Sequence, residues 1–488
     1  MFSGLSDNMN PDLVAFVIGF DHFIVFYFIV INLGLLALFA SSVRSLWQFV
    51  QGSFNADYAQ IRNSDLTLPI SLLVPAYNEE ATITHTVHSL LRANYGEFEI
   101  VVINDGSRDN TLSVLIDAFK MERRSEPVKL QLKSKPIRAI YRSSLNPNLV
   151  VIDKENGGKA DALNAGLNLS RYPLFGSIDA DSIIEDGALL RLVKPFIEYP
   201  EETIAAGGIV RVANGCVIND GHVEQVRLPA SRLAVMQVVE YLRAFLAGRA
   251  GWSAARSLLI ISGAFGLFRK REVIEVGGYS DATDTEDAEI VVRLHRRMCE
   301  QGMKYRIVFV PDPVCWTEVP ETLRVLTVQR SRWHRGLLQT LWLNRGMLFR
   351  RRYGSVGLIG MPWYVMFELL APVIEVLGFV VIPLAWMLGI LDHVHMFLFI
   401  FVAFFLGALL SVGALALEEM TFQRYARWQD LLRLMVYGFV ENIGFRQYLT
   451  LIKVKALVDA IWRRREWGEM QRRGFGVTNS QAGKLRES

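Results

Sequence analysis

Cysteine is scarce in this chain of 488 residues, which contains only three: Cys216, Cys299 and Cys315. Their number is odd and no two of them form a C-x-x-C pair. The sequence therefore indicates neither a disulfide framework nor a zinc site built on cysteine pairs. A reducing compartment is expected.

Charge is also low, because charged residues make up 21% of the chain and hydrophobic residues 51%. The formal net charge of +3 creates no overall field that would attract nucleic acid, so we expect no nucleic acid as a partner. The apolar share, with a mean hydropathy of +0.25, excludes a disordered or solvating chain. The length corresponds to roughly three domains, which excludes a single small binding module.

Apolar residues gather in three long blocks. The first, Phe23 to Val43, has no charged residue and is long enough to cross a membrane core of ~30 Å. The second runs from about Gly357 to Leu391, and the third from Met396 to Leu417. The residues before the first block include aspartates but no Lys or Arg, the reverse of a signal peptide. We therefore expect membrane spans.

Arginines flank these blocks on one side only, which by the positive-inside rule is the cytoplasmic side. We expect an external N-terminus, a cytoplasmic loop from about Asp65 to Arg352, and a multi-pass protein of a bacterial-type inner (plasma) membrane. The last apolar stretch, Leu431 to Ala460, is interrupted by charges and is expected to be an interfacial or re-entrant helix before a basic cytoplasmic tail. The flanking arginines are Arg44, Arg350, Arg351, Arg352, Arg424, Arg427 and Arg433.

Two acidic residues, Glu368 and Glu375, fall on one face of the helix expected for the second block. A carboxylate in a span usually faces a polar cavity or a partner. The alternative is that both lie near the membrane interface and are solvated. The sequence leaves both alternatives open.

The expected cytoplasmic loop alternates short β-branched runs with helical segments. Ile70 to Val74 and Phe98 to Ile103 are predicted strands, each followed by a predicted helix. This βαβ rhythm predicts a mostly parallel sheet whose ligands lie beyond the carboxyl ends of the strands. No G-x-G-x-x-G follows the first strand and no G-x-x-x-x-G-K-[ST] is present, so neither a dinucleotide fold nor a P-loop ATPase is supported.

Polar side chains follow these strands. Leu174 to Ile178 is a predicted strand that runs into Asp179 and Asp181. This acidic pair can hold Mg²⁺ or Mn²⁺ together with substrate phosphates. The alternative is a surface turn, which is what an isolated D-x-D most often is. A glycine-rich loop ends at Lys159, which with the backbone amides can meet a phosphate or form a solvated turn. Asp105 is placed to bind a base or ribose, or to cap Ser107 or the next helix.

Two further segments offer catalytic groups. Glu286 and Asp287 precede a predicted helix, where an acidic residue is most often a cap but can also take a proton from a hydroxyl. Gln329, Arg332 and Trp333 share one helix face, where the guanidinium suits a diphosphate and the indole suits a sugar ring. The arginine-rich stretch around them also fits a helix that lies on anionic lipid. Both interpretations can hold together.

The ordered set of motifs resembles membrane-bound family 2 glycosyltransferases, the processive polysaccharide synthases that include the poly-N-acetylglucosamine, hyaluronan, chitin and cellulose synthases. Each motif is weak alone, but the whole set in the family's order inside a membrane-anchored loop is specific. The motifs are Val74-Pro-Ala-Tyr-Asn-Glu-Glu80, Asn104-Asp-Gly-Ser107, Gly157-Gly-Lys159, Asp179-Ala-Asp181, Thr285-Glu-Asp287 and Gln329-Arg-Ser-Arg-Trp333.

The resemblance implies an α/β GT-A (Rossmann-like) domain joined to a transmembrane helical region, and an inverting transfer from a UDP-sugar to a growing β-linked polysaccharide. The implied partners are the UDP-sugar donor, the glycan acceptor and the lipid bilayer, and a small membrane accessory subunit is left open. The resemblance implies that Asp105 contacts uridine and that Lys159 and Asp179 contact the nucleotide. It implies that Asp181 holds Mg²⁺ or Mn²⁺ and that Asp287 is the base. It also implies that Gln329 and Arg332 bind the diphosphate and that Trp333 and Glu286 bind the acceptor.

The expected layout is a transmembrane helix and linker over residues 1–64, the GT-A glycosyltransferase domain over 65–328, and amphipathic interface helices over 329–356. Two transmembrane helices follow over 357–418, and the interfacial helix with its basic tail occupies 419–488. Two alternatives remain beside a processive synthase: an enzyme that transfers one sugar to a lipid, and a non-catalytic membrane scaffold or transporter that keeps a degenerate nucleotide fold.

Overall fold

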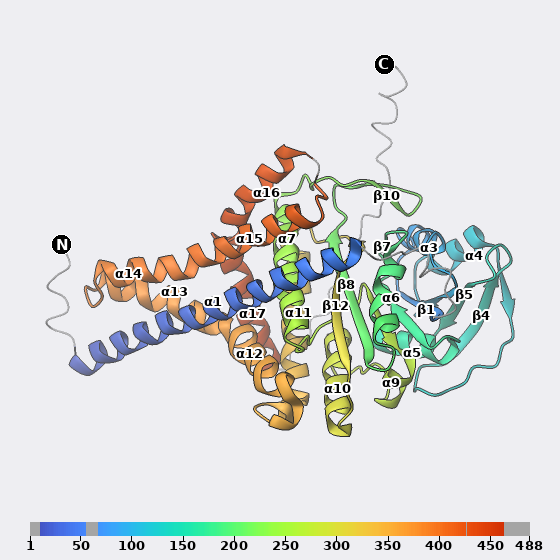
Figure 1. Ribbon diagram of the computed structural model, residues 1–488, viewed down its shortest axis with the longest axis horizontal. Helices are drawn as coiled ribbons and strands as arrows, with labels where there is room; N and C mark the ends of the chain where they lie inside the picture. The colour runs from blue at the N-terminus through green and yellow to red at the C-terminus, as the bar shows by residue number, and fades with distance from the viewer. Residues whose placement is uncertain (1–9, 55–66, 426, 463–488) are drawn as a thin grey trace, which may run out of the picture.

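The computed structural model describes residues 10–54, 67–425 and 427–462. A domain built around a β-sheet stands at one end, and a bundle of long helices extends away from it (Figure 1). Most of the expected linker before residue 65 and the basic tail that begins at residue 463 lie outside the described residues.

Three helical stretches are long and apolar enough to cross a membrane: Pro11–Gln51, Val356–Met387 and His393–Thr421. They contain the first and third apolar blocks of the sequence and all but the last four residues of the second, and they make this a membrane protein. The first stretch is one continuous helix, α1 (Pro11–Phe54). The second is irregular, since prolines remove backbone donors, and comprises η5 (Val356–Gly360), α12 (Met361–Tyr364), η6 (Val365–Leu369) and α13 (Ala371–Met387). The third comprises α14 (His393–Ile400), η7 (Phe401–Phe405) and α15 (Leu406–Thr421).

The main sheet has ten strands in the order β3-β4-β5-β2-β1-β6-β11-β8-β12-β7. The strands β5, β2, β1 and β6 are parallel to one another, whereas β11 runs antiparallel to both of its neighbours. The bounds are β1 (Ile70–Ala76), β2 (Phe98–Asn104), β3 (Met121–Arg124), β4 (Ile137–Ser143), β5 (Leu149–Lys154), β6 (Leu174–Ser177), β7 (Ser182–Ile184), β8 (Thr203–Val212), β11 (Gly266–Arg269) and β12 (Arg306–Thr317).

The sheet is therefore mixed: most of its strands run in one direction, as expected, but it is not purely parallel. The βαβ rhythm describes the parallel centre correctly, but β3, β4, β7 and β11 add antiparallel pairs at its sides. The direction of such a strand depends on where the chain returns to the sheet, which local periodicity does not encode.

Helices pack on this sheet because their apolar faces match its buried residues. In β1 and β2 nearly every side chain is buried, and Gly166 in α5 allows that helix to approach Leu73 and Ile103 closely. The helices of the domain are α3 (Ile83–Leu91), α4 (Thr111–Phe119), α5 (Lys159–Leu169), α6 (Ala188–Glu198), α7 (Arg232–Leu242), α8 (Ala250–Ala254), α9 (Lys270–Glu275), α10 (Glu286–Gln301) and α11 (Leu323–Leu343). A π-helix, η2 (Arg243–Arg249), follows α7, and a small hairpin forms from β9 (Val217–Asn219) and β10 (His222–Gln225).

The helical bundle is joined to the domain through buried polar contacts. Ser42 of α1 donates a hydrogen bond to the carbonyl of Ala247 at 2.7 Å. Arg211 of β8 pairs with Glu418 of α15 at 2.7 Å, and both side chains are only 2% exposed. The cytoplasm-facing ends expected for the spans are thus the ends that meet the sheet domain.

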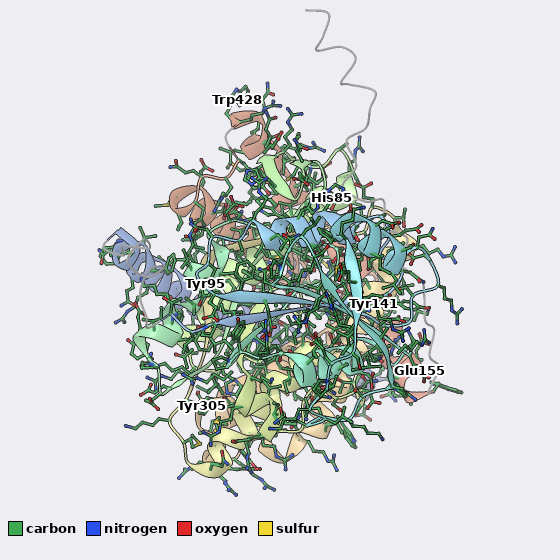
Figure 2. The ribbon with its side chains drawn as sticks, turned by 90° about the vertical axis from the view of Figure 1, so that its right-hand side faces the viewer. His85, Tyr95, Tyr141, Glu155, Tyr305 and Trp428 are labelled. Atoms are coloured by element: carbon green, nitrogen blue, oxygen red, sulfur yellow. The ribbon has the colours of Figure 1, made fainter. Side chains whose placement is uncertain are left out.

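The last apolar stretch forms two helices rather than the one expected. They are α16 (Trp428–Val440) and α17 (Phe445–Ile461), and the chain turns between them at Gly444, whose φ is +86°. Figure 2 views the molecule from the sheet end, with Trp428 of α16 at the top and Tyr141 of β4 at the near sheet edge. The break accommodates Glu441, a buried carboxylate that pairs with Arg243 and accepts a hydrogen bond from Ser411.

The helix α17 packs between α11 and α13 and gives Glu375 its partners. Arg446 lies 3.3 Å from one carboxylate oxygen of Glu375, and the hydroxyl of Thr450 donates to the other at 2.9 Å. Of the two alternatives for Glu375, the one with a polar partner is therefore confirmed.

Candidate active site

A cavity of about 870 Å³ opens between the carboxyl ends of the central strands and helix α11. This is within the range of pockets that hold nucleotide-sized ligands. Its walls come from the loop before α5, the segment after β6, the loop before α10, η2 and α11. The expected site residues that line it are Lys159, Asp179, Asp181, Glu286, Asp287, Gln329, Arg332 and Trp333.

Lys159, the first residue of α5, joins two acidic segments of the cavity. Its ammonium lies 2.5 Å from Asp179, which follows β6, and 3.2 Å from Glu286, which opens α10. Burial disfavours the charged lysine, but the carboxylates of Asp179, Glu286 and Asp287 outweigh that effect and raise its pKa. Lys159 is therefore a permanent cation on the floor of the cavity.

Asp287 is held at the start of α10 by backbone amides. Its two carboxylate oxygens accept hydrogen bonds from the N–H of Gly263 at 3.0 Å and of Ala288 at 2.9 Å. Burial raises the pKa of Asp287, the neighbouring charge of Glu286 raises it further, and Lys159 opposes both. A fixed carboxylate of raised basicity, open to a cavity, has the properties of a general base.

The close approach of this loop to Lys159 favours glycine at position 263. A Cβ built there would lie 2.8 Å from the ammonium of Lys159 and 3.4 Å from the Cβ of Asp287. Gly263 belongs to the segment Ser262 to Gly266, which precedes and enters β11. Here the segment supplies a backbone donor to Asp287.

Asp105, in contrast, does not line the cavity. It is 3% exposed and lies beneath the glycine-rich loop, where it accepts hydrogen bonds from the amides of Gly157 at 3.0 Å and Gly158 at 2.8 Å. It also pairs with Lys154 of β5, whose side chain is fully buried. These amides are therefore used to shape the loop, and the contact between Asp105 and uridine stays a prediction.

Helix α11 contributes Gln329, Arg332 and Trp333 to the cavity, and these side chains differ in their exposure. Gln329 is buried, and Arg332 and Trp333 are exposed, with Trp333 at 37%. Arg330, for which the motif predicted no role, pairs with Glu240 of α7 at 2.8 Å, and its guanidinium lies 4.2 Å from the centre of the Trp333 ring. This stacking fixes the indole plane at the wall of the cavity.

The position of α11 relative to Asp287 is set by contacts one turn further along. Arg335 pairs with Asp284 at 2.9 Å, and the side chain of Gln339 accepts from the backbone of Asp284 at 2.7 Å. Gly336 lies directly against Thr285, since a Cβ there would be 2.2 Å from the Thr285 hydroxyl. The segment around Asp284 and Thr285 and helix α11, distant in sequence, therefore pack as one unit.

Sequence reasoning did not find Glu240, Tyr241 and Arg249, which line the cavity from α7 and η2. Burial lowers the pKa of the Arg249 guanidinium, which lies 3.8 Å from the centre of the Phe245 ring. No short motif marks these residues. The π-helix η2, which follows α7 and ends at Arg249, is a signal that only the structure provides, and such helices are frequent at functional sites.

The donor set at the carboxyl end of β6 fits a hard divalent cation. Asp179 and Asp181 both reach the cavity and offer oxygen ligands, as Mg²⁺ and Mn²⁺ prefer. Asp179 already contacts Lys159, so Asp181 is the carboxylate best placed to serve as the metal ligand.

Two family models match this chain. The model of glycosyl transferase family 2 matches residues 71–232, and that of glycosyl transferase family group 2 matches residues 177–412. The matched region therefore includes the whole cavity and continues into the membrane helices.

Curated relatives and one solved structure agree with these matches. Poly-beta-1,6-N-acetyl-D-glucosamine synthases of Staphylococcus epidermidis and Staphylococcus aureus are 31% and 30% identical, over 56% of this chain and 56% of their own. The chain thus spans about half the length of the curated relatives it matches. The mannosyltransferase PcManGT of Pyrobaculum calidifontis, solved with GDP-Man and Mn²⁺, has a TM-score of 0.50 and 17% identity over 89% of this chain and 99% of that one. Its likeness shows the fold alone, and the expected GT-A, Rossmann-like fold is confirmed.

Proposed function

Because the chain belongs to family 2 of the glycosyltransferases, we propose that it transfers a sugar from a UDP-sugar to the hydroxyl of a growing β-linked polysaccharide, with inversion at the anomeric carbon. The observation that carries this proposal is the single cavity shared by Asp181, Asp287 and Trp333. The names of the curated relatives make UDP-N-acetylglucosamine the first donor to test.

In the proposed reaction Asp287 takes the proton of the acceptor hydroxyl. The oxygen then forms a bond to the anomeric carbon, and the bond from that carbon to the UDP oxygen breaks. One displacement without a covalent enzyme intermediate inverts the anomeric centre. Lys159 and Arg332 supply positive charge for the departing diphosphate, and Trp333 offers an aromatic face to the acceptor sugar.

A divalent ion is part of the proposal, and Asp181 would hold it, with Asp179 close by. When bound, Mg²⁺ or Mn²⁺ would neutralise charge on the diphosphate. Asp105 remains a proposed contact for the uridine, Gln329 for the diphosphate, and Glu286 for the acceptor.

We further propose that the catalytic domain, residues 65–328, lies in the cytoplasm of a bacterial-type inner membrane and that residues 329–356 lie at its surface. Support comes from the arginine flanks, which meet the sheet domain: Arg424 contacts Glu185 of that domain at 2.8 and 3.1 Å. The adjacent spans, residues 357–418, would receive the product for export, and the transfer would then be processive.

The test uses the full chain purified in detergent and a panel of UDP-N-acetylglucosamine, UDP-glucose, UDP-glucuronic acid and GDP-mannose, with Mn²⁺ or Mg²⁺. We expect one UDP-sugar to support nucleotide release that EDTA abolishes. Asp287→Asn should lower the rate by roughly 10²- to 10⁴-fold. Asp117→Asn, at an exposed position of α4 outside the cavity, is the matched control and should keep the wild-type rate.

Product length separates the remaining alternatives. Chains of many sugars support a processive synthase, whereas one sugar on each lipid molecule replaces it with a single-transfer enzyme. Full turnover in Asp287→Asn would refute the assignment of the base. GDP-mannose as the sole donor would refute the UDP-sugar.

A further inference from the structure

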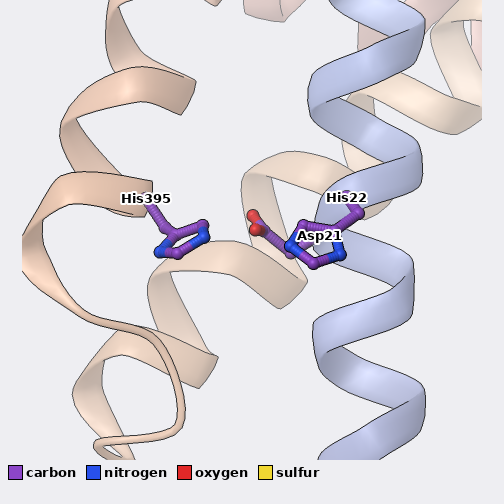
Figure 3. Close-up of side chains that lie close together, drawn as sticks. All are labelled: Asp21, His22 and His395. Carbon is purple, nitrogen blue, oxygen red and sulfur yellow. The ribbon is translucent and has the colours of Figure 1, made fainter.

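A second group of metal-ligating side chains lies at the far end of the helical bundle, away from the sheet domain. Asp21 and His22 come from α1 and His395 comes from α14 (Figure 3). Each offers one ligand atom, and these atoms all lie within 4.8 Å of one another. The rings of His22 and His395 are 5.9 Å apart between their centres.

The carboxylate of Asp21 is the unusual member of this group. The residue is 1% exposed, and within the described part of the chain neither of its carboxylate oxygens has a hydrogen-bond partner. A buried carboxylate without hydrogen bonds is costly unless a cation compensates it. Figure 3 shows this carboxylate directed at the ring of His395, with His22 beside it.

The ring of His395 is oriented by a second carboxylate. Asp392, the cap of α14, accepts a hydrogen bond from the backbone N–H of His395 at 2.9 Å and lies 2.7 Å from its Nδ1. Because Nδ1 is engaged there, Nε2 is the nitrogen left for another ligand. A histidine that donates one ring N–H to a carboxylate and offers its other nitrogen is the usual arrangement behind a bound metal.

We propose that Asp21, His22 and His395 bind a divalent transition metal, Zn²⁺ in the first instance, and that Asp392 orients His395 for it. Two imidazoles and one carboxylate suit Zn²⁺ and do not suit Mg²⁺ or Ca²⁺, which take oxygen ligands. Three protein ligands leave one tetrahedral position for water or a small ligand. The site is separate from the one proposed at Asp181 and does not depend on the proposed transfer reaction.

Such an ion would join segments that are far apart in the sequence. It would connect the early turns of α1 to the first turn of α14, at the end of the bundle opposite the sheet domain (Figure 1). Metal binding would therefore stabilise the packing of the first span against the later spans.

The test titrates Zn²⁺, and Co²⁺ as a visible-absorption probe, into the full chain in detergent after removal of any affinity tag and treatment with EDTA. We expect one saturable site with the absorption of tetrahedral Co²⁺. Asp21→Asn, His22→Gln and His395→Gln should each abolish that absorption, and Asp392→Asn should weaken binding by about 10- to 100-fold.

Two controls isolate the site. His393→Gln alters a histidine that instead accepts a hydrogen bond from Trp386 at 3.0 Å, and it should bind as the wild type does. Asp181→Asn should also keep the signal, since it affects only the nucleotide cavity. An unchanged elution profile and far-UV circular dichroism spectrum of the metal-free Asp21, His22 and His395 variants show that they are folded.

Wild-type affinity and stoichiometry in both Asp21→Asn and His395→Gln would overturn the proposal. X-ray absorption of the Zn²⁺-loaded wild-type protein gives a measurement that needs no variant. Nitrogen and oxygen ligands with two imidazoles support the site, and a spectrum without imidazole overturns it.

Discussion

Two adjacent carboxylates of the cavity, Glu286 and Asp287, have different surroundings. Glu286 contacts the ammonium of Lys159, whereas Asp287 is held by the amides of Gly263 and Ala288. Burial and the charge of Glu286 raise the pKa of Asp287. The proposed base therefore owes part of its basicity to its neighbour in the chain.

Glu286→Gln should shift the pH profile of the reaction. As the proposed base, Asp287 would act only when deprotonated, so its raised pKa would place the acidic limb of kcat/KM above the ordinary aspartate pKa of about 3.9. Removing the charge of Glu286 lowers the pKa of Asp287, and activity should then persist to lower pH. The measurement is kcat/KM against pH for both proteins. An acidic limb that stays in place would contradict this coupling, whatever the change in maximal rate.

At the scale of residues, the sequence motifs contain most of the expected site residues that line the cavity. Acidic residues at strand ends and the Gln329 to Trp333 helix face converge because parallel strands end on one side of the sheet. Asp105 departs from this pattern because Lys154 and the glycine-loop amides surround it. The environment of Arg330 was not predictable, since Glu240 approaches it from a helix that carries no recognisable motif.

At the scale of elements, the contact between α11 and the loop before α10 determines where the acceptor-side residues lie relative to the base. Gly336 is the point of closest approach, because Thr285 occupies the space where a side chain would be. Thr285 is β-branched and short, so it cannot move aside as the end of a flexible side chain would.

Gly336→Ala should displace α11 from the base. The new methyl group would overlap Thr285, which costs about 1–3 kcal/mol and moves Trp333 relative to Asp287. We expect a lower kcat and a lower midpoint of thermal unfolding. The matched control is Gly346→Ala, since a Cβ at Gly346 meets nothing within 4 Å. Equal activity and stability of both variants would show that the contact does not position α11.

Element type was easier to predict than element direction. The helices and strands of the first half of the domain follow from local periodicity, and β1 and β2 begin at the expected residues, Ile70 and Phe98. The antiparallel strand β11 and the break at Gly444 were missed. Both depend on distant partners: β6 and β8 for the strand, and Arg243 and Ser411 for Glu441 beside the break.

At the scale of the whole molecule, buried charges join the membrane helices to the sheet domain. The pair between Arg211 and Glu418 crosses from β8 to α15 with both side chains almost fully buried. Such a pair is not strongly stabilising compared with apolar residues, but loss of one partner leaves the other charge buried.

Glu418→Gln should therefore destabilise the junction by roughly 3–5 kcal/mol, because the guanidinium of Arg211 loses its counter-charge. The measurement is the midpoint of thermal unfolding in detergent. Glu419→Gln is the matched control, since Glu419 makes no ion pair within the described part of α15 and its surroundings. The double variant Arg211→Met with Glu418→Leu should recover much of the loss, and a double variant as unstable as Glu418→Gln would contradict this account.

The sequence by itself determined the membrane blocks, the βαβ centre of the domain and the order of the acidic and Q-x-x-R-W motifs, because each depends on residues close together in the chain. Only the tertiary structure decided which strands run antiparallel, that Asp105 supports the glycine-rich loop, and that Arg330 pairs with Glu240. It also brought Asp21 and His22 to His395. These contacts join residues far apart in the chain, and long-range packing, rather than local pattern, selects such partners.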